Sequence, residues 1–373
     1  MRILFLDHSA RAAAVVLTIF LIALLAACGV PPPTPTLVPP PTLPSETFPH
    51  PQNPAIEPTP VGGLNLKGRF VFAQGDGSLL VEDAGSNSPR VVFKATTDLR
   101  GDSPVFSADG KQIAFSASSF TKDGAVLQDV RVINVDGTSL RVVTTPEQPK
   151  ITLGFPAWSP DGKDLFITQS YSVPPASQHD EIDRVSVNGG PLRQVIENAR
   201  EASPSSDGKR IVFSRLDLQT YSSSLWIADI DGSSPKQLLG TGVFAALYGA
   251  RFAPDSQSIV FAASGTPNKK LPGAYTLNRS SRDDACAVSL VFICLVEKAE
   301  AHGLPWDLWL VNLDGTKFER LTEIELDSPV PAWSGDGKQI AFSDATGIYV
   351  LALATKKIYQ ASESRGYGGF DWR

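Results

Sequence analysis

The chain has 373 residues and a formal net charge of −6, with 42% hydrophobic and 19% charged residues. This mildly acidic balance excludes the basic footprint of a nucleic-acid-binding protein, so we expect no nucleic-acid partner. The apolar content suffices for a folded core, and repeated units can build one continuous core from a chain of this length.

The first 27 residues have the features of a signal peptide. Arg2 and Arg11 precede the apolar run AAAVVLTIFLIALLAAC, which is short for a membrane span of ~20 residues and ends in small residues. Its last letters, LAAC, resemble the lipobox of bacterial lipoproteins. This resemblance implies that Cys28 is lipidated and attaches the protein to a membrane. Ordinary secretory cleavage after the Ala pair and an uncleaved anchor are the alternatives.

Residues 28–63 begin with that cysteine and continue as a proline-rich segment, GVPPPTPTLVPPPTLPSETFPHPQNPAIEPTP. Proline at this density cannot donate the hydrogen bonds of a sheet and favours the polyproline II conformation, at about 3.1 Å per residue. We therefore predict an extended tether between the membrane and a folded domain. A ligand for proline-binding domains is the less favoured alternative.

A repeated phrase occupies residues 64–373, and the unit returns every 46 to 52 residues except once. The first half of the unit occurs as SPVFSADGKQIAFSA (103–117), PAWSPDGKDLFITQS (156–170), ASPSSDGKRIVFSR (202–215), ARFAPDSQSIVFAAS (250–264) and PAWSGDGKQIAFSD (331–344). The second half occurs as RVINVDGTSLRVVTT (131–145), RVSVNGGPLRQVIE (184–197), LWIADIDGSSPKQLL (225–239) and LWLVNLDGTKFERLT (308–322), with a weaker copy IYVLALATKKIYQAS (348–362).

Each half reads as a strand, a tight turn and a strand. Asp-Gly after a short apolar segment is a strong hairpin signal, since Gly supplies the positive φ and Asp bonds the local backbone. After the turn, residues such as Ile113 and Phe115 alternate with polar or small neighbours, which is the period of a half-buried strand. Radial repetition of four-stranded antiparallel units predicts an all-β fold, a β-propeller.

The two ends of the repeat region complete each other. GRFVFAQ, SLLVEDAG and PRVVFKA match the second, third and fourth strands of a unit, whereas GGFDWR at the C-terminus matches a first strand. We therefore predict that the C-terminal strand pairs into the first blade. Counting this split blade, the fold class is a six-bladed β-propeller.

The phrase WSPDGK-x-IAF…DGT resembles the TolB-like propeller repeat of bacterial envelope proteins, and the likeness covers residues 64–373. Two copies depart from it: Ser205 stands where the other copies place an aromatic residue, and PDSQ replaces PDGK in the fifth blade. The resemblance implies a fold and assigns no function. The chain also lacks the N-terminal domain of TolB, so the partners of TolB are not transferred to it.

The connections opposite the Asp-Gly turns vary in sequence and length, and variable loops on a rigid scaffold are where binding residues usually lie. We therefore place a candidate partner site on this rim and at the channel mouth, with packing within the loops as the alternative role. The variable connections are 116–129, 169–183, 239–250 and an insertion at 266–305, and the candidate contact residues are Tyr171, His179, Tyr248 and Trp306.

The insertion contains the two remaining cysteines, Cys286 and Cys294. Outside the cytoplasm such a pair is expected to form a disulfide. Eight residues on an extended strand would separate them by ~26 Å, whereas a disulfide needs Cα atoms within about 7 Å. The predicted disulfide therefore requires the intervening segment to fold back, and two buried free thiols are the alternative.

Catalytic signatures are scarce. No G-x-S-x-G motif occurs, and His50, His179 and His302 have no metal-ligand spacing, so we expect no catalytic residue, no metal and no cofactor. Aspartates recur at regular positions in the predicted turns, where we assign them a structural role: Asp109, Asp161, Asp207, Asp255 and Asp336.

The leading hypothesis is a non-enzymatic, lipid-anchored protein of the cell envelope. Its propeller would act outside the cytoplasm as a binding or scaffolding module for a protein or a polysaccharide at the variable rim. The alternative is a propeller enzyme, a glycosidase or lyase with carboxylates in the channel. A sensor or assembly subunit of a transport system is a third, lesser hypothesis.

Overall fold

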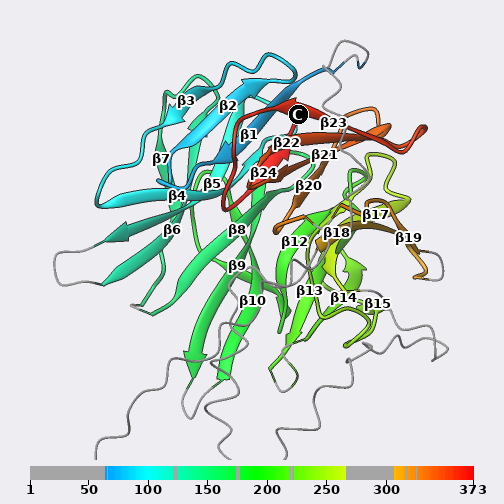
Figure 1. Ribbon diagram of the computed structural model, residues 1–373. Helices are drawn as coiled ribbons and strands as arrows, with labels where there is room; N and C mark the ends of the chain where they lie inside the picture. The colour runs from blue at the N-terminus through cyan, green and yellow to red at the C-terminus, as the bar shows by residue number, and fades with distance from the viewer. Residues whose placement is uncertain are drawn as a thin grey trace, which may run out of the picture. The chain divides into compact units, whose positions relative to one another are not determined.

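The computed structural model describes residues 64–373 except 65, 121–124, 149, 174–176, 219, 221, 266–305, 316–317 and 325 (Figure 1). The predicted signal peptide and tether, Cys28, and the insertion with Cys286 and Cys294 lie outside the described residues. Those described belong to one compact unit, Pro51–Arg373. Among them every regular element is a strand, and none forms a helix that could cross a membrane.

The strands are ordered sheet by sheet along the chain. The first sheet contains β24 (Phe370–Trp372), β1 (Arg69–Ala73), β2 (Leu79–Asp83) and β3 (Arg90–Phe93), in that order. An eight-stranded sheet contains β4 (Leu99–Phe106), β5 (Gln112–Phe120), β6 (Val126–Asn134), β7 (Arg141–Thr144), β8 (Thr152–Trp158), β9 (Asp164–Val173), β10 (Ser177–Ser186) and β11 (Arg193–Glu197).

Three further sheets have four strands each, in chain order. They contain β12 (Arg200–Pro204), β13 (Arg210–Asp217), β14 (Ser222–Asp229) and β15 (Lys236–Leu239); β16 (Ala246–Phe252), β17 (Ser258–Ser264), β18 (Trp306–Asn312) and β19 (Phe318–Arg320); and β20 (Val330–Trp333), β21 (Gln339–Asp344), β22 (Gly347–Ala352) and β23 (Lys357–Ser362).

The predicted all-β propeller architecture is confirmed, but the sheet count differs from the prediction. The described residues form four four-stranded sheets and one eight-stranded sheet rather than six separate blades. The eight-stranded sheet results from a single parallel pair, Gln128 with Thr152, which joins β6 to β8.

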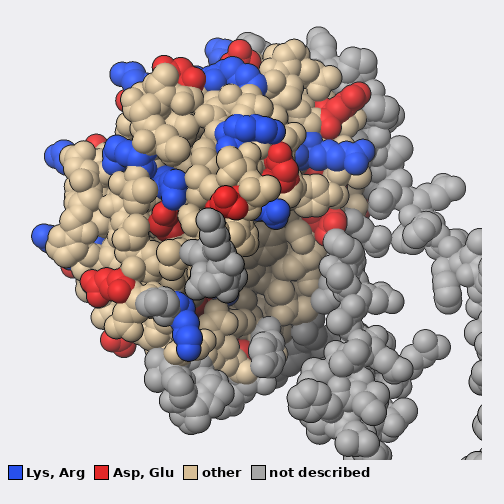
Figure 2. All heavy atoms as spheres, turned by 90° about the vertical axis from the view of Figure 1, so that its left-hand side faces the viewer, with Lys and Arg blue, Asp and Glu red and all other residues tan. Residues whose placement is uncertain are grey.

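The core lies between sheets, where apolar faces of neighbouring strands meet. Within the described residues six apolar clusters are present. Five of them draw their residues from two different sheets, and the sixth lies within the eight-stranded sheet, between its β5–β7 and β8–β10 strands. One of them joins Ala341 and Val350 of the last sheet to Phe70 and Phe370 of the first. Figure 2 shows that basic and acidic side chains are interspersed on the face it views.

The predicted pairing of the two ends of the repeat region is present. Phe70 pairs with Trp372 and Phe72 with Phe370, in antiparallel register. The Phe370 and Trp372 side chains are 1% and 4% exposed, and the Trp372 indole donates a hydrogen bond of 2.8 Å to the Lys67 carbonyl.

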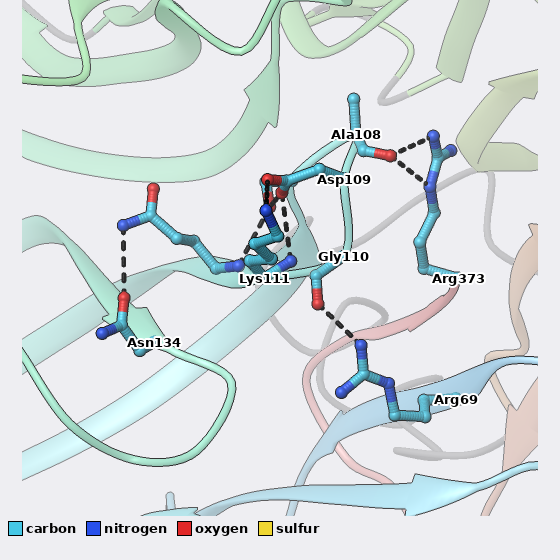
Figure 3. Close-up of polar contacts among 9 residues, drawn as sticks. Arg69, Ala108, Asp109, Gly110, Lys111, Asn134 and Arg373 are labelled. Atoms are coloured by element: carbon cyan, nitrogen blue, oxygen red, sulfur yellow. Dashed lines mark hydrogen bonds and ion pairs between the residues drawn. The ribbon is translucent and has the colours of Figure 1, made fainter.

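Two arginines of this strand pair also bind the next sheet (Figure 3). Arg69 donates to the Gly110 carbonyl at 2.8 Å, and Arg373 Nε donates to the Ala108 carbonyl at 2.9 Å. Both carbonyls belong to the turn between β4 and β5. The C-terminal strand therefore connects two sheets as well as completing one.

The recurring aspartates close their own turns, which confirms their structural role. In the first full copy Ser107 donates to Asp109 at 2.7 Å, and Asp109 accepts the Lys111 N–H at 3.1 Å. The same bonds recur at Asp161, Asp207 and Asp336. In the turn between β16 and β17 Asp255 accepts the Gln257 N–H, and Ser256 adopts the positive φ of 58° that glycine adopts elsewhere.

The structure corrects the reading of the copy at 202–215 by one residue. Ser205 is the serine that closes the turn, donating to Asp207 at 2.6 Å. The position of the aromatic residues Phe106 and Trp158 is therefore filled by Pro204, the last residue of β12.

A glycine in the turn between the third and fourth strands of a sheet also permits close packing against the neighbouring sheet. A Cβ on Gly232 would lie 2.1 Å from the Val195 carbonyl oxygen, and the φ of Gly232 is 86°. Gly162 lies in the turn between β8 and β9 and has a φ of 69°, but a Cβ on it would have no neighbour within 4 Å. Conformation alone requires glycine at Gly162, whereas both conformation and contact require it at Gly232.

We expect Trp372→Ala to lower the free energy of unfolding by about 3–5 kcal/mol, because it removes a buried aromatic side chain between two sheets. Urea denaturation of the full chain measures this. The matched control is Tyr367→Ala, which truncates a C-terminal aromatic residue that is 51% exposed. Equal losses in the two variants would contradict the packing role of Trp372.

Gly232→Ala is expected to cost about 2–4 kcal/mol, since left-handed strain adds to a clash with a neighbouring backbone. Gly162→Ala is expected to cost only about 1 kcal/mol, the strain alone. Thermal or urea unfolding of both variants tests the difference. If Gly162→Ala were the more damaging substitution, the proposed close contact between sheets would be wrong.

Candidate functional site

The two rims of the sheets can be distinguished by strand register. Leu99, at the start of β4, pairs with Ser119, near the end of β5. The start of each first strand therefore lies at the same rim as the connection between the second and third strands. The Asp-Gly turns lie at the opposite rim. The variable connections predicted to carry binding thus share the rim where the first strands begin.

Bulges interrupt the first strands near this rim. The register shifts between Asp102 and Val105 in β4, and equivalent shifts occur in β8, β12 and β16. A residue of each bulge has a positive φ, namely Ser103, Phe155, Glu201 and Gly249. A bulge re-aims the side chains beside it, and bulges are over-represented next to functional sites.

The bulged segments surround a cavity of about 320 Å³. Its lining comes from β4, β8, β12 and β16 and from the segments around Ser328 and Gly368. Most of the lining is apolar, with Pro104, Val105, Phe155, Pro156, Val330 and Phe370 among its residues. Its polar side chains include Asp102, Glu201, Tyr248 and Arg251. An apolar cavity with a few convergent polar groups is typical of a ligand site.

Arg251 separates this cavity from a second one. It lines the first cavity and also a cavity of about 230 Å³ toward the Asp-Gly turns, which Asp371 lines as well. Burial lowers the pKa of the Arg251 guanidinium, and attraction to Asp371 and Glu201 opposes that effect. Burial likewise raises the pKa of Asp371, which accepts the Phe106 N–H at 2.8 Å. The attraction between Arg251 and Asp371 therefore offsets part of the effect of burial on each group.

The carboxylate of Glu201 has a hydrogen-bond donor and a cationic neighbour. Its Oε2 accepts the Gly249 N–H at 3.1 Å, and Arg200 Nε lies 3.6 Å from its Oε1. Glu201 thus has a cationic neighbour from the same strand.

Asp102 is in a different position. Its Oδ1 accepts hydrogen bonds from the Ser103 N–H at 2.5 Å and the Ser103 hydroxyl at 3.3 Å. Burial raises the pKa of Asp102 to about 6, an effect that the Ser103 bonds oppose. Among the described residues no basic side chain pairs with Asp102, and the hydrogen bonds from Ser103 both reach its Oδ1. It is the carboxyl group in this cavity without a counter-charge.

The residues predicted to make rim contacts form two separate pairs. Tyr248 lines the cavity and packs against Trp306, with ring centroids 4.8 Å apart. Tyr171 of β9 stacks on His179 of β10 at 5.5 Å, outside the cavity lining. Both pairs contain a ring–ring contact, so packing accounts for part of their role.

Sequence reasoning missed Asp102 and Arg251. Asp102 precedes the repeated phrase and reads as a solvated strand start. Arg251 occupies the position where β4 has Val105 and β8 has Ala157. A charged residue at a position that is apolar in other copies was the sequence feature that could have identified it.

Exposed apolar side chains gather on the same rim. Phe120, Val126 and Leu127 lie at the β5–β6 connection, and Leu218 follows the end of β13; each is 38–47% exposed. Phe155, 40% exposed, lies at the cavity. Within the described residues no group of three or more His, Cys, Asp and Glu side chains is arranged to hold a metal ion.

Neither a protein-family profile nor a curated protein sequence matches the chain. Among solved structures, TolB from Acinetobacter baumannii is similar with a TM-score of 0.57 at 16% identity, over 82% of this chain and 66% of that chain. A protein assigned as TolB from Agrobacterium tumefaciens gives 0.51 at 17% identity, over 82% of this chain and 98% of that one. A chain of the nidogen/laminin complex gives 0.55 at 12% identity, over 82% and 97%.

The chain thus spans slightly less than two thirds of the Acinetobacter baumannii protein. Identities this low show similarity of fold and nothing of activity. The chain has a TolB-like β-propeller fold.

Proposed function

We propose that this chain is a lipid-anchored binding module that works outside the cytoplasm and binds a protein or a cell-surface polymer through its variable rim. In this proposal residues 1–27 are removed as a signal peptide, Cys28 carries the lipid and residues 28–63 form the tether. Residues 64–373 form the propeller, with 266–305 as an insertion in the fifth blade. The sequence features of the N-terminal segment support the anchor, and the fold likeness to TolB is consistent with this location.

The proposal counts the eight-stranded sheet as two blades, β4–β7 and β8–β11. Only the pair Gln128–Thr152 joins them, whereas every other neighbouring pair of strands in that sheet shares an antiparallel register of several residues. With the four other sheets this gives six blades, and the pairing of β24 with β1 closes their ring. The apolar cluster between the last sheet and the first supports this closure.

The observation that carries the binding function is the set of exposed apolar side chains on the rim where the first strands begin. Side chains of this kind are usually buried, and a gathering of them on one rim marks an interaction surface. Val126 and Phe120 are partners across the β5–β6 hairpin, so their side chains form one apolar pair at its end. The Asp-Gly turns at the other rim are short and satisfy their own hydrogen bonds, which suits a structural role.

The second candidate function is a carbohydrate-active enzyme. Asp102, with its pKa raised to about 6, and Glu201 line one cavity, and two carboxyl groups in different environments are the basis of acid–base hydrolysis of glycosides. A screen of the full chain against polysaccharides tests this. Turnover that Asp102→Asn alone abolishes would replace the binding function by this one.

For the binding function we expect the double variant Val126→Ser, Leu127→Ser to weaken the interaction of the full chain at least tenfold. Each side chain buried in an interface contributes about 1.5–3 kcal/mol when fully buried. The measurement is binding of the purified full chain to immobilised envelope proteins and to a panel of cell-surface polysaccharides.

The matched control is Leu140→Ser, Val142→Ser. These side chains are 43% and 46% exposed and lie around the start of β7 in the outer part of the same blade. Equal binding by both double variants, with both folded, would refute the rim as the binding surface.

A further inference from the structure

Among the acidic side chains that line the cavity of about 320 Å³, Asp102 is the one without a cationic neighbour. Arg251 faces Asp371 and Glu201, and Glu201 has Arg200 3.6 Å away. Asp102 has only the N–H and hydroxyl of Ser103 on one of its oxygens. Counting the side chains that line the cavity, two carboxylates face one guanidinium. An occupant with a positive charge would therefore complete the balance.

The cavity itself favours an occupant with an apolar body. A volume of about 320 Å³ lies at the small end of ligand sites, and prolines, valines and aromatic residues supply seven of the sixteen residues that line it. Burial in such a wall weakens solvent screening, so that a charge pair inside it is stronger than one on the surface. The carboxyl group of Asp102 lies at a bulge of β4, on a strand fixed by its neighbours rather than on a loop.

We propose that this cavity binds a cationic group carried on an apolar stem, with Asp102 as its counter-ion. The occupant's ammonium or guanidinium donates to the free oxygen of Asp102, while its stem packs against Pro104, Phe155 and Val330. This site rests on the proposed function and deepens it, because the cavity is lined by the starts of the first strands, which lie at the proposed binding rim. The chemistry is the same for a small amine and for a lysine or arginine side chain presented by a protein.

An anionic occupant fits less well. The carboxylates of Asp102 and Glu201 line the same cavity and would repel it, and Arg251 is already attracted by two carboxylates. A neutral occupant would leave Asp102 without a partner.

The test is calorimetric titration of the full chain with 4-phenylbutylamine. Its two matched analogues are 4-phenylbutanol, which lacks the charge, and 4-phenylbutyrate, which reverses it. We expect the amine to bind at least tenfold more tightly than either analogue, because a hydrogen bond to a charged group contributes about 1.5–3 kcal/mol. Equal affinities for amine and alcohol would overturn the proposal.

Variants locate the binding. Asp102→Asn should weaken amine binding at least tenfold, Asp102→Glu should restore part of it, and Asp83→Asn, at an exposed aspartate of β2, should leave it unchanged. Asp102 also accepts the Ser103 N–H, so Asp102→Asn could disturb the local backbone. A separate variant, Val330→Phe, therefore fills the cavity and leaves its charges in place. Full amine binding by folded Asp102→Asn or by folded Val330→Phe would refute the site.

Two acetylated dipeptide amides distinguish the sources of the cation. Binding of acetyl-Phe-Lys-amide, with no binding of acetyl-Phe-norleucine-amide, would identify a protein side chain as an occupant, whereas binding of the free amine alone would identify a small molecule. If the wild-type chain binds a protein or polysaccharide at the rim but does not bind 4-phenylbutylamine, this inference is refuted and the proposed function stands.

Discussion

The pairing of β24 with β1 is the contact on which the rest of the structure depends. It joins segments about 300 residues apart, and it places Phe370 and Trp372 in the cluster shared by the first and last sheets. Without β24, β1 would be an exposed edge strand with unpaired backbone groups, which is a template for aggregation. Because Arg373 also binds the turn of the next sheet, the same few residues stabilise contacts on both sides of the first sheet.

The cavity is a consequence of this arrangement. Equivalent segments of the first strands meet around it, so a substitution in one copy of the repeat becomes a single distinctive group at the centre. Arg251 is such a group, since Val105 and Ala157 stand at its position in other copies. Bulges interrupt four of these first strands beside the cavity, whereas β20 and β24 keep a regular register with their neighbours. Structural repetition and local departure from it therefore supply the scaffold and the site, respectively.

Much of the fold followed from the sequence because its signals are local. The Ser-x-Asp-Gly-Lys turn fixes a hairpin by bonds within five residues, and alternating residues such as Ile113 and Phe115 identify the strand after it. The joining of β6 to β8 was not predictable, since it depends on how closely two sheets approach. The position of Ser205 was misassigned by one residue because the bonds of the turn, rather than residue type, define the register. Asp102 escaped notice because burial, which sequence does not display, is what distinguishes it from a surface aspartate.

The central claim is that the last strand holds the first sheet and its neighbours together. Amide hydrogen exchange of the full chain, compared with a chain that ends after Gly369, tests it most directly. The Arg69 amide donates to the Arg373 carbonyl, which the truncated chain lacks. We predict that the truncated chain loses protection in β1, β20 and β21 while β13 and β14 keep theirs. Unchanged protection of β1 in the truncated chain would contradict the account.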